Sequence, residues 1–303
     1  MGFDVTSWLL FLAVLVNQVG RVMIPAIKTS VLADKDFAPE FEQSVGAMLS
    51  GVSLVCLFGK LLGAVVTDKL GGWLVLIVVF VIWVIVTLMS IATTSVPVFG
   101  AAWLLNSFAY TITWGAAVQV VGATYDDANR GAQLSKIASA SRFGATLGNI
   151  FFGQLLSSGL HWRQTLMPAV PIQVLLLLMC AYYWATSRTT DSLATAKPAS
   201  AAAAKKEDAS KSAGGDEPSA LAAMLSLDFW LMLLPKAVLF TYTQFFMNYI
   251  PQLLNVVYGY DHGAAATYGG VAQGGSVVGL LYVGNVLYKK STKAAQVKPE
   301  VCK

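Results

Sequence analysis

The sequence predicts an all-α membrane protein, and composition and segment length carry this prediction. The chain of 303 residues is 56% hydrophobic and only 12% charged, and its mean hydropathy is +0.64. These values lie far from those of an average soluble domain. A helix that crosses a bilayer needs about 20 largely apolar residues. The chain contains eight such segments, so we expect about eight transmembrane helices in contact with a lipid bilayer.

The eight segments differ in how apolar they are. The third carries no charge, the fifth contains Lys136 and Arg142, and the eighth is rich in glycine. The first lacks the basic start and the cleavage site of a signal peptide, so we interpret it as a retained helix. In chain order the segments cover residues 8–27, 44–66, 73–92, 97–121, 133–158, 166–186, 229–250 and 264–288.

Basic residues gather at one set of segment ends. The positive-inside rule predicts that this side, and with it both termini, faces the cytoplasm. The opposite side is expected to carry only Lys28, Lys35 and Arg163. The net charge of +4 then reflects membrane topology, and we expect no nucleic-acid partner. The basic side is expected to hold Lys69, Arg130, Arg188, Lys197, Lys205, Lys206, Lys211, Lys289, Lys290, Lys293, Lys298 and Lys303.

One long polar break divides the chain. Residues 187–221 lack apolar periodicity and include the charged run Lys205-Lys206-Glu207-Asp208. A segment of this composition cannot bury a core and is typical of a flexible linker. We therefore expect a six-helix bundle at 1–186, a cytoplasmic linker at 187–224, two further helices at 225–290 and a cytoplasmic tail at 291–303.

A glycine motif precedes the third segment. Gly59 and Gly63 lie four residues apart, and glycines at this spacing share a helix face that a neighbouring helix can approach closely in lipid. A short charged turn is expected to follow, with Asp68, Lys69, Gly71 and Gly72 before the apolar run resumes.

This motif resembles the loop between the second and third helices of major facilitator superfamily transporters. The resemblance implies a major facilitator-type helical bundle, of which the chain would contain the complete N-terminal six-helix half and two helices of the second half. In that family the loop takes part in a charge relay that stabilises one access state. The resemblance thus implies such a role for Asp68, with Arg130 as a candidate partner.

A second set of motifs is similar to the organophosphate and organic-anion branch, which includes sugar-phosphate exchangers. The motifs are Thr113-Trp114-Gly115, Asn129-Arg130-Gly131, Gly148-Asn149, Trp162-Arg163 and Tyr249-Ile250-Pro251. The resemblance implies transport of a small organic anion, such as a sugar phosphate, glycerol phosphate or carboxylate, by alternating access as an antiporter or symporter. The complete fold has twelve helices, so the alternative is a truncated product that inserts into the membrane without transporting.

Three cations interrupt the apolar segments. Arg21, Arg142 and Lys236 lie inside the first, fifth and seventh segments, and no acidic residue lies in a segment interior to pair with them. Ionisable residues within a membrane are costly and usually functional. An anionic substrate would supply the missing charge, although these side chains could instead reach the interface. The resemblance implies that Arg21 and Lys236 clamp a substrate phosphate.

Polar residues at helical spacing accompany these cations. In the fifth segment a three-four repeat places Thr146 and Asn149 on the face of Arg142, and in the fourth Asn106 shares a face with Tyr110. We expect Tyr110, Gln244 and Asn248 to donate hydrogen bonds to the solute.

The sequence offers little for catalysis. Its only histidines, His161 and His262, fall in predicted loops, and its three cysteines have no metal or disulfide spacing. No nucleophile motif, zinc-protease motif or phosphate-binding loop occurs, so we expect neither an enzyme nor a cofactor. A channel is a weaker alternative because no repeated ring of charge is present. The sequence leaves the oligomeric state and the membrane open.

Overall fold

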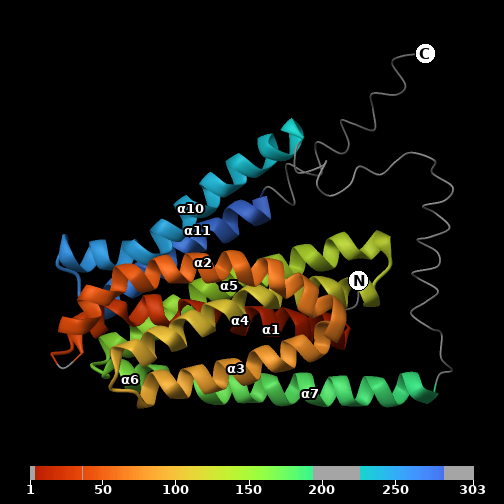
Figure 1. The fold of residues 1–303 in the computed structure, drawn as a ribbon, viewed down its shortest axis with the longest axis horizontal. Coiled ribbons are helices and arrows are strands. Elements are labelled where there is room, and N and C mark those ends of the chain that lie inside the picture. Colours follow the sequence, from red (N-terminus) through yellow and green to blue (C-terminus); the bar gives the residue numbers. More distant parts are fainter. Residues whose placement is uncertain (1–3, 36, 194–225, 283–303) are drawn as a thin grey trace. The chain divides into compact units, whose positions relative to one another are not determined.

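The computed structural model describes residues 4–35, 37–193 and 226–282, and no strand occurs within these ranges. Figure 1 shows the arrangement of the helices. They are α1 (Val5–Leu32), α2 (Ala38–Leu70), α3 (Gly72–Ala92), α4 (Val96–Thr124), α5 (Asp127–Ser157), α6 (Trp162–Leu166), α7 (Ala169–Leu193), α10 (Leu227–Val256) and α11 (His262–Tyr282).

The chain forms two compact units. The larger contains Met1–Ala181 and Met247–Lys303, and the smaller contains Tyr182–Phe246. Helices α7 and α10 therefore contribute residues to both units. The larger unit contains α1 to α6, the start of α7, the end of α10 and all of α11.

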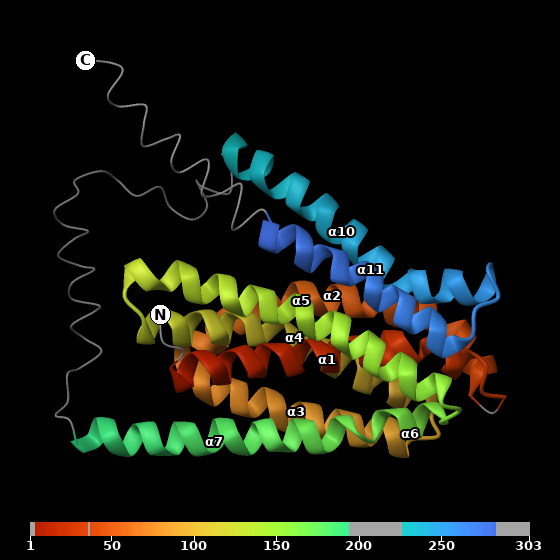
Figure 2. The same cartoon turned by 180° about the vertical axis from the view of Figure 1, so that it is seen from behind.

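Helix α1 is the centre of the larger unit. It packs along α4 and α5, and it also contacts α2, α6 and α11 (Figure 2). Within the 18-residue apolar stretch of α1, two thirds of the residues are buried, whereas only 6% are buried in the corresponding stretch of α2. Most polar side chains of α1 are therefore buried within the protein, and Arg21 is half-buried.

Glycines on α5 allow close packing on two sides. A Cβ atom on Gly144 would lie against the Leu15 carbonyl oxygen of α1, and one on Gly153 would lie against Thr267 of α11. Gly270 of α11 in turn lies against Asn149 of α5. Helix α5 is therefore held tightly between α1 and α11.

The second helix extends further than the sequence predicted. Asp68 and Lys69 were expected in a loop, but they lie in the last turn of α2, which continues to Leu70. Only Gly71 separates α2 from α3, and its φ of 84° is a conformation that favours glycine. One glycine therefore makes the whole turn, and the charged pair remains helical.

The sixth segment also differs from its predicted form. It begins as the short helix α6, breaks at Met167 and Pro168, and continues as α7 to Leu193. Proline lacks the amide hydrogen that a helix needs and disfavours the helical conformation in the residue before it, which accounts for the break. Helix α7 extends into the segment expected as linker, and residues 194–225 lie outside the described ranges.

Five stretches are long and apolar enough to cross a membrane. They are Val5–Leu32, Pro39–Lys60, Gly72–Ala92, Val96–Thr124 and Trp162–Ser187. The described parts of α5, α10 and α11 do not meet this test of length and composition. The prediction of a helical multi-pass membrane protein is thus confirmed, whereas the count of eight spans stays a prediction.

Charged and aromatic side chains fasten the helix ends at one end of the larger unit. The Trp162 indole Nε1 donates to Asp34 Oδ2 at 2.7 Å, and Arg163 Nη1 lies 3.6 Å from the same oxygen. Arg163 Nη2 also donates to the Thr93 carbonyl oxygen at 3.1 Å. The rings of Phe37 and Trp162 pack with centroids 5.6 Å apart. These contacts join the α1–α2, α3–α4 and α5–α6 connections.

Candidate substrate site

Arg21 lies in the middle of α1 and points toward α4. Its Nη1 atom donates a hydrogen bond to the Tyr110 hydroxyl oxygen at 3.0 Å. The guanidinium carbon also lies 4.3 Å from the centroid of the same ring, which is a cation–π contact. Arg21 is half-buried, so part of its fork of donors remains accessible.

Gln18 extends this network to α5. Its Nε2 atom donates to Ser141 Oγ at 2.7 Å and lies 3.3 Å from the Tyr110 hydroxyl oxygen. Gln18 is one turn before Arg21, so both reach Tyr110 from α1. Three helices, α1, α4 and α5, thus fix the position of one guanidinium.

Two asparagines lie beside this network. Asn106 of α4 donates from Nδ2 to the Gly20 carbonyl oxygen at 3.2 Å, which holds the α1 backbone next to Arg21. Asn17 is 2% exposed, and its Oδ1 atom has no hydrogen-bond partner. Buried polar atoms are usually paired. The Asn17 amide oxygen is therefore a buried acceptor without a protein donor, one turn from Arg21.

The site is positively charged. Within the described ranges, the ion pairs found join Asp34 to His161 and Arg163, and none includes Arg21. The described residues contain no cluster of His, Cys, Asp or Glu that could hold a metal ion. Arg21 therefore presents a positive charge that no described side chain neutralises.

The comparison with protein families matches this architecture. The family model of the Major Facilitator Superfamily matches residues 10–297. The chain belongs to the Major Facilitator Superfamily. No curated protein matches it at a significant level. Membership in this superfamily makes the chain an integral multi-pass protein of a transporter family.

Lys28 lies in an environment that the sequence did not predict. The sequence placed it beyond the first segment, among the charges of one membrane side, but α1 continues to Leu32 and Lys28 is only 1% exposed. Its Nζ atom donates to the backbone oxygen of Asn248 at 2.6 Å and lies 4.9 Å from the centroid of the Tyr249 ring. Helix α1 thus continues beyond the predicted end of the first segment at residue 27, whereas the membrane side assigned to Lys28 stays a prediction.

The predicted binding residues are only partly brought together. Arg21 and Tyr110 are in direct contact. Asn248 approaches α1 through its backbone oxygen. Arg142 is exposed on α5, one residue after Ser141. The side chains of Lys236 and Gln244 lie outside the described part of the chain, so their role stays a prediction.

The polar face predicted on α5 is partly covered. Thr146, Asn149 and Gly153 lie against glycines and Thr267 of α11. This part of the face mediates helix packing, whereas Ser141, one residue before Arg142, accepts a hydrogen bond from Gln18 of the Arg21 network. Gln18 and Ser141 were missed, although their polarity within apolar segments was a visible signal.

The major facilitator motif on α2 packs against α4. A Cβ atom on Gly59 would lie against Thr111 Oγ1, and one on Gly63 would lie 3.0 Å from Ile112 Cγ1. Asp68 is exposed, and Arg130 Nη2 donates to the Gly122 carbonyl oxygen at 3.2 Å. The relay between Asp68 and Arg130 stays a prediction.

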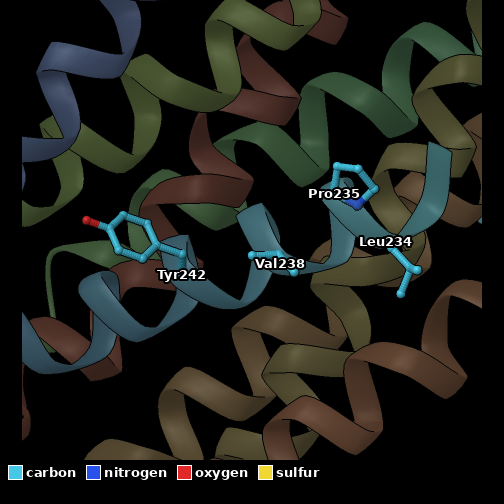
Figure 3. Close-up of a pocket in the computed structure, with 4 residues that line it drawn as sticks. All are labelled: Leu234, Pro235, Val238 and Tyr242. Carbon is cyan, nitrogen blue, oxygen red and sulfur yellow. The ribbon is translucent and has the colours of Figure 1, made fainter. Parts of the chain in front are cut away.

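An open depression on α10 does not have the character of an anion site. Its lining residues are Leu234, Pro235, Val238 and Tyr242, which follow one another along the helix (Figure 3). All four are exposed, and the Tyr242 hydroxyl is the only polar side-chain group among them. Such an apolar surface suits contact with lipid or another helix better than binding of a charged solute.

Proposed function

We propose that this protein transports a small organic anion and that Arg21 is its principal ligand. The observation that carries the proposal is a half-buried guanidinium, fixed by Tyr110 in the centre of the bundle, without a carboxylate partner among the described residues. A charge inside a membrane protein is costly unless something compensates it. A negatively charged solute supplies that compensation when it binds.

The neighbouring groups favour an anion that also carries hydroxyl groups. Arginine recognises carboxylate or phosphate oxygens with two parallel hydrogen bonds, which accounts for affinity and orientation. The Asn17 amide oxygen can accept a hydrogen bond from a hydroxyl group of the same solute. Sugar phosphates, glycerol phosphate and hydroxylated carboxylates share this combination, which agrees with the motifs similar to the organic-anion branch.

The proposal includes a topology and a transport cycle. We infer about eight spans with both termini in the cytoplasm, and alternating access of the site to the two sides of the membrane. Lys236, Arg142, Gln244 and Asn248 are proposed to contribute to the same site. No acidic residue lies in a segment interior to mark a proton relay, so exchange and symport both agree with the sequence.

Uptake by the purified chain in proteoliposomes tests the proposal. Labelled glycerol phosphate, a sugar phosphate and a hydroxylated dicarboxylate are compared with glycerol and glucose, which have similar shapes but no charge. We expect accumulation or counterflow of at least one anion and of neither neutral solute. Equal uptake of glycerol and glycerol phosphate would contradict the proposed anion selectivity.

A further inference from the structure

The second cation of α1, Lys28, has an unusual environment. It is almost completely buried, yet none of the ion pairs found within the described ranges includes it. Its ammonium group bonds to a neutral backbone oxygen of α10 and lies near the Tyr249 ring. A buried charge is normally paired with an opposite charge or a full set of hydrogen bonds. The backbone oxygen of Asn248 and the Tyr249 ring only partly compensate the buried charge of Lys28.

Lys28 and Arg21 belong to the same face of α1. Seven residues are nearly two full turns, so the two side chains project in similar directions, with Cα atoms about 10 Å apart along the axis. Side chains on a helix lean toward its N-terminus. The flexible stem of Lys28 therefore leans toward the level of Arg21, and a change of rotamer can carry its ammonium group closer to that site.

Each of the two helices in contact, α1 and α10, contains a proline that weakens the helix locally. Pro25 lies between Arg21 and Lys28 in α1, and Pro251 lies three residues after Asn248 in α10. Proline removes a helical hydrogen bond and leaves nearby carbonyl groups open to outside donors. Pro251 leaves the Met247 carbonyl group without its helical donor, and the Lys28 ammonium bonds to the next carbonyl group, that of Asn248, through a hydrogen bond that can be exchanged.

We propose that Lys28 is a second anion ligand, which exchanges the Asn248 carbonyl oxygen for the second negative charge of a dianionic substrate held at Arg21. A hydrogen bond between two charged groups is roughly twice as strong as one between neutral groups. A substrate oxyanion thus competes effectively with a backbone oxygen. This inference rests on the proposed anion transport, and it defines the substrate class as a dianion, either a phosphate or a dicarboxylate.

The exchange also links binding to movement. The bond from Lys28 to Asn248 ties α1 to the end of α10. A monoanion neutralises Arg21 and leaves that tie in place. A dianion binds both Arg21 and Lys28, so its binding breaks the hydrogen bond between Lys28 of α1 and Asn248 of α10.

Equilibrium binding by the purified full chain tests the inference. The ligands are succinate, inorganic phosphate and monomethyl succinate, at a pH where the first two are dianions. The informative variant is Lys28→Gln, because glutamine can still donate to the Asn248 oxygen but carries no charge. We expect its affinity for succinate, phosphate or both to fall on the order of ten- to hundredfold, the range for one charge-assisted hydrogen bond. Its affinity for monomethyl succinate should change by less than about threefold.

Two further variants separate charge from structure. Lys28→Arg keeps the positive charge and should retain most of the preference for dianions. Lys35→Gln removes the same charge from an exposed position outside the helices and should change nothing. A loss confined to phosphate identifies a phosphate-type substrate, and a loss confined to succinate identifies a dicarboxylate; each supports the inference.

The outcomes also distinguish this inference from the proposed function. If Lys28→Gln weakens the monoanion and both dianions equally, or weakens none of them, while Arg21→Ala weakens all three, Lys28 has a structural role and the inference is wrong. If Arg21→Ala leaves all three affinities unchanged, the proposed anion site itself is wrong.

Discussion

At the scale of single residues, Tyr110 determines how the guanidinium of Arg21 is presented. Its hydroxyl oxygen accepts from Arg21 and from Gln18, and its ring lies beneath the charge. A ligand that is held in its binding geometry before the substrate arrives loses less conformational freedom on binding. The tyrosine is thus a positioning residue as well as a predicted donor.

Replacement of Tyr110 by phenylalanine should weaken anion binding. The ring and the cation–π contact remain, but two hydrogen bonds to the hydroxyl oxygen are lost. We expect a decrease in affinity of about three- to tenfold, which corresponds to roughly 1 kcal/mol for the bond that positions Arg21. Isothermal titration with the transported anion measures it. Tyr182→Phe, at an exposed position, is the matched control. An unchanged affinity in Tyr110→Phe would exclude the positioning role.

The sequence could identify some of these residues and not others. Arg21 stands out because a charge in an apolar segment is rare, and Tyr110 shares a predicted polar face. The burial of Lys28 was not predicted, because the end of an apolar run was taken as the end of a helix. The helix continues through Thr29 and Ser30, whose polarity does not prevent helix formation inside a protein. Contacts such as that of Gln18 with Ser141 depend on tertiary packing, which spacing alone does not specify.

At the scale of helices, glycine decides how closely α2 approaches α4. A methyl group on Gly59 would meet Thr111 Oγ1 and lie 3.2 Å from Phe108. Overpacking of this kind typically costs about 1–3 kcal/mol. Gly59→Ala should therefore lower the apparent unfolding temperature in detergent.

A glycine on the same helix supplies the control. A methyl group added at Gly46 would have no neighbouring atom within 4 Å, so Gly46→Ala should leave the unfolding temperature unchanged or raise it. Alanine favours a helix over glycine by about 1 kcal/mol. If both variants unfold at the same temperature, close packing at Gly59 does not contribute to stability.

The charged end of α2 is expected to act in the transport cycle. Asp68 lies in the last turn of α2, next to a turn made by Gly71 alone, so its position is fixed by the helix. We predict that Asp68→Asn slows uptake severalfold without reducing the amount of inserted protein, because the relay would lose its anion. Glu42→Gln removes an exposed carboxylate from the other end of α2 and should transport normally. Equal uptake by the two variants would assign the Asp68 motif to packing alone.

At the scale of the whole molecule, composition predicted the fold class because apolar runs long enough to span a bilayer leave few alternatives. The positions at which helices break were harder to predict from the sequence, because Pro168 and Gly71 act through local backbone geometry. The close contacts that glycines allow between α5 and its neighbours α1 and α11 were also not predictable, because a glycine pattern does not identify which helix approaches it.

The predicted topology can be measured with single cysteines. Glu40 and Lys69 are exposed at opposite ends of α2, so cysteines there should react with an impermeant thiol reagent from opposite sides of the membrane. The experiment uses a full chain in which Cys56, Cys180 and Cys302 are replaced. Labelling of both positions from one side would contradict the assignment of α2 as a span.

The most direct test of the central claim measures anion binding by Arg21→Ala and Arg21→Lys. A charge-assisted hydrogen bond contributes roughly 1.5–3 kcal/mol, so alanine should weaken binding of the transported anion by about ten- to hundredfold or more. Lysine restores the charge without the bidentate geometry, and it should recover only part of the affinity. Binding of the anion by Arg21→Ala with the affinity of the parent protein would show that Arg21 is structural and that the anion site lies elsewhere.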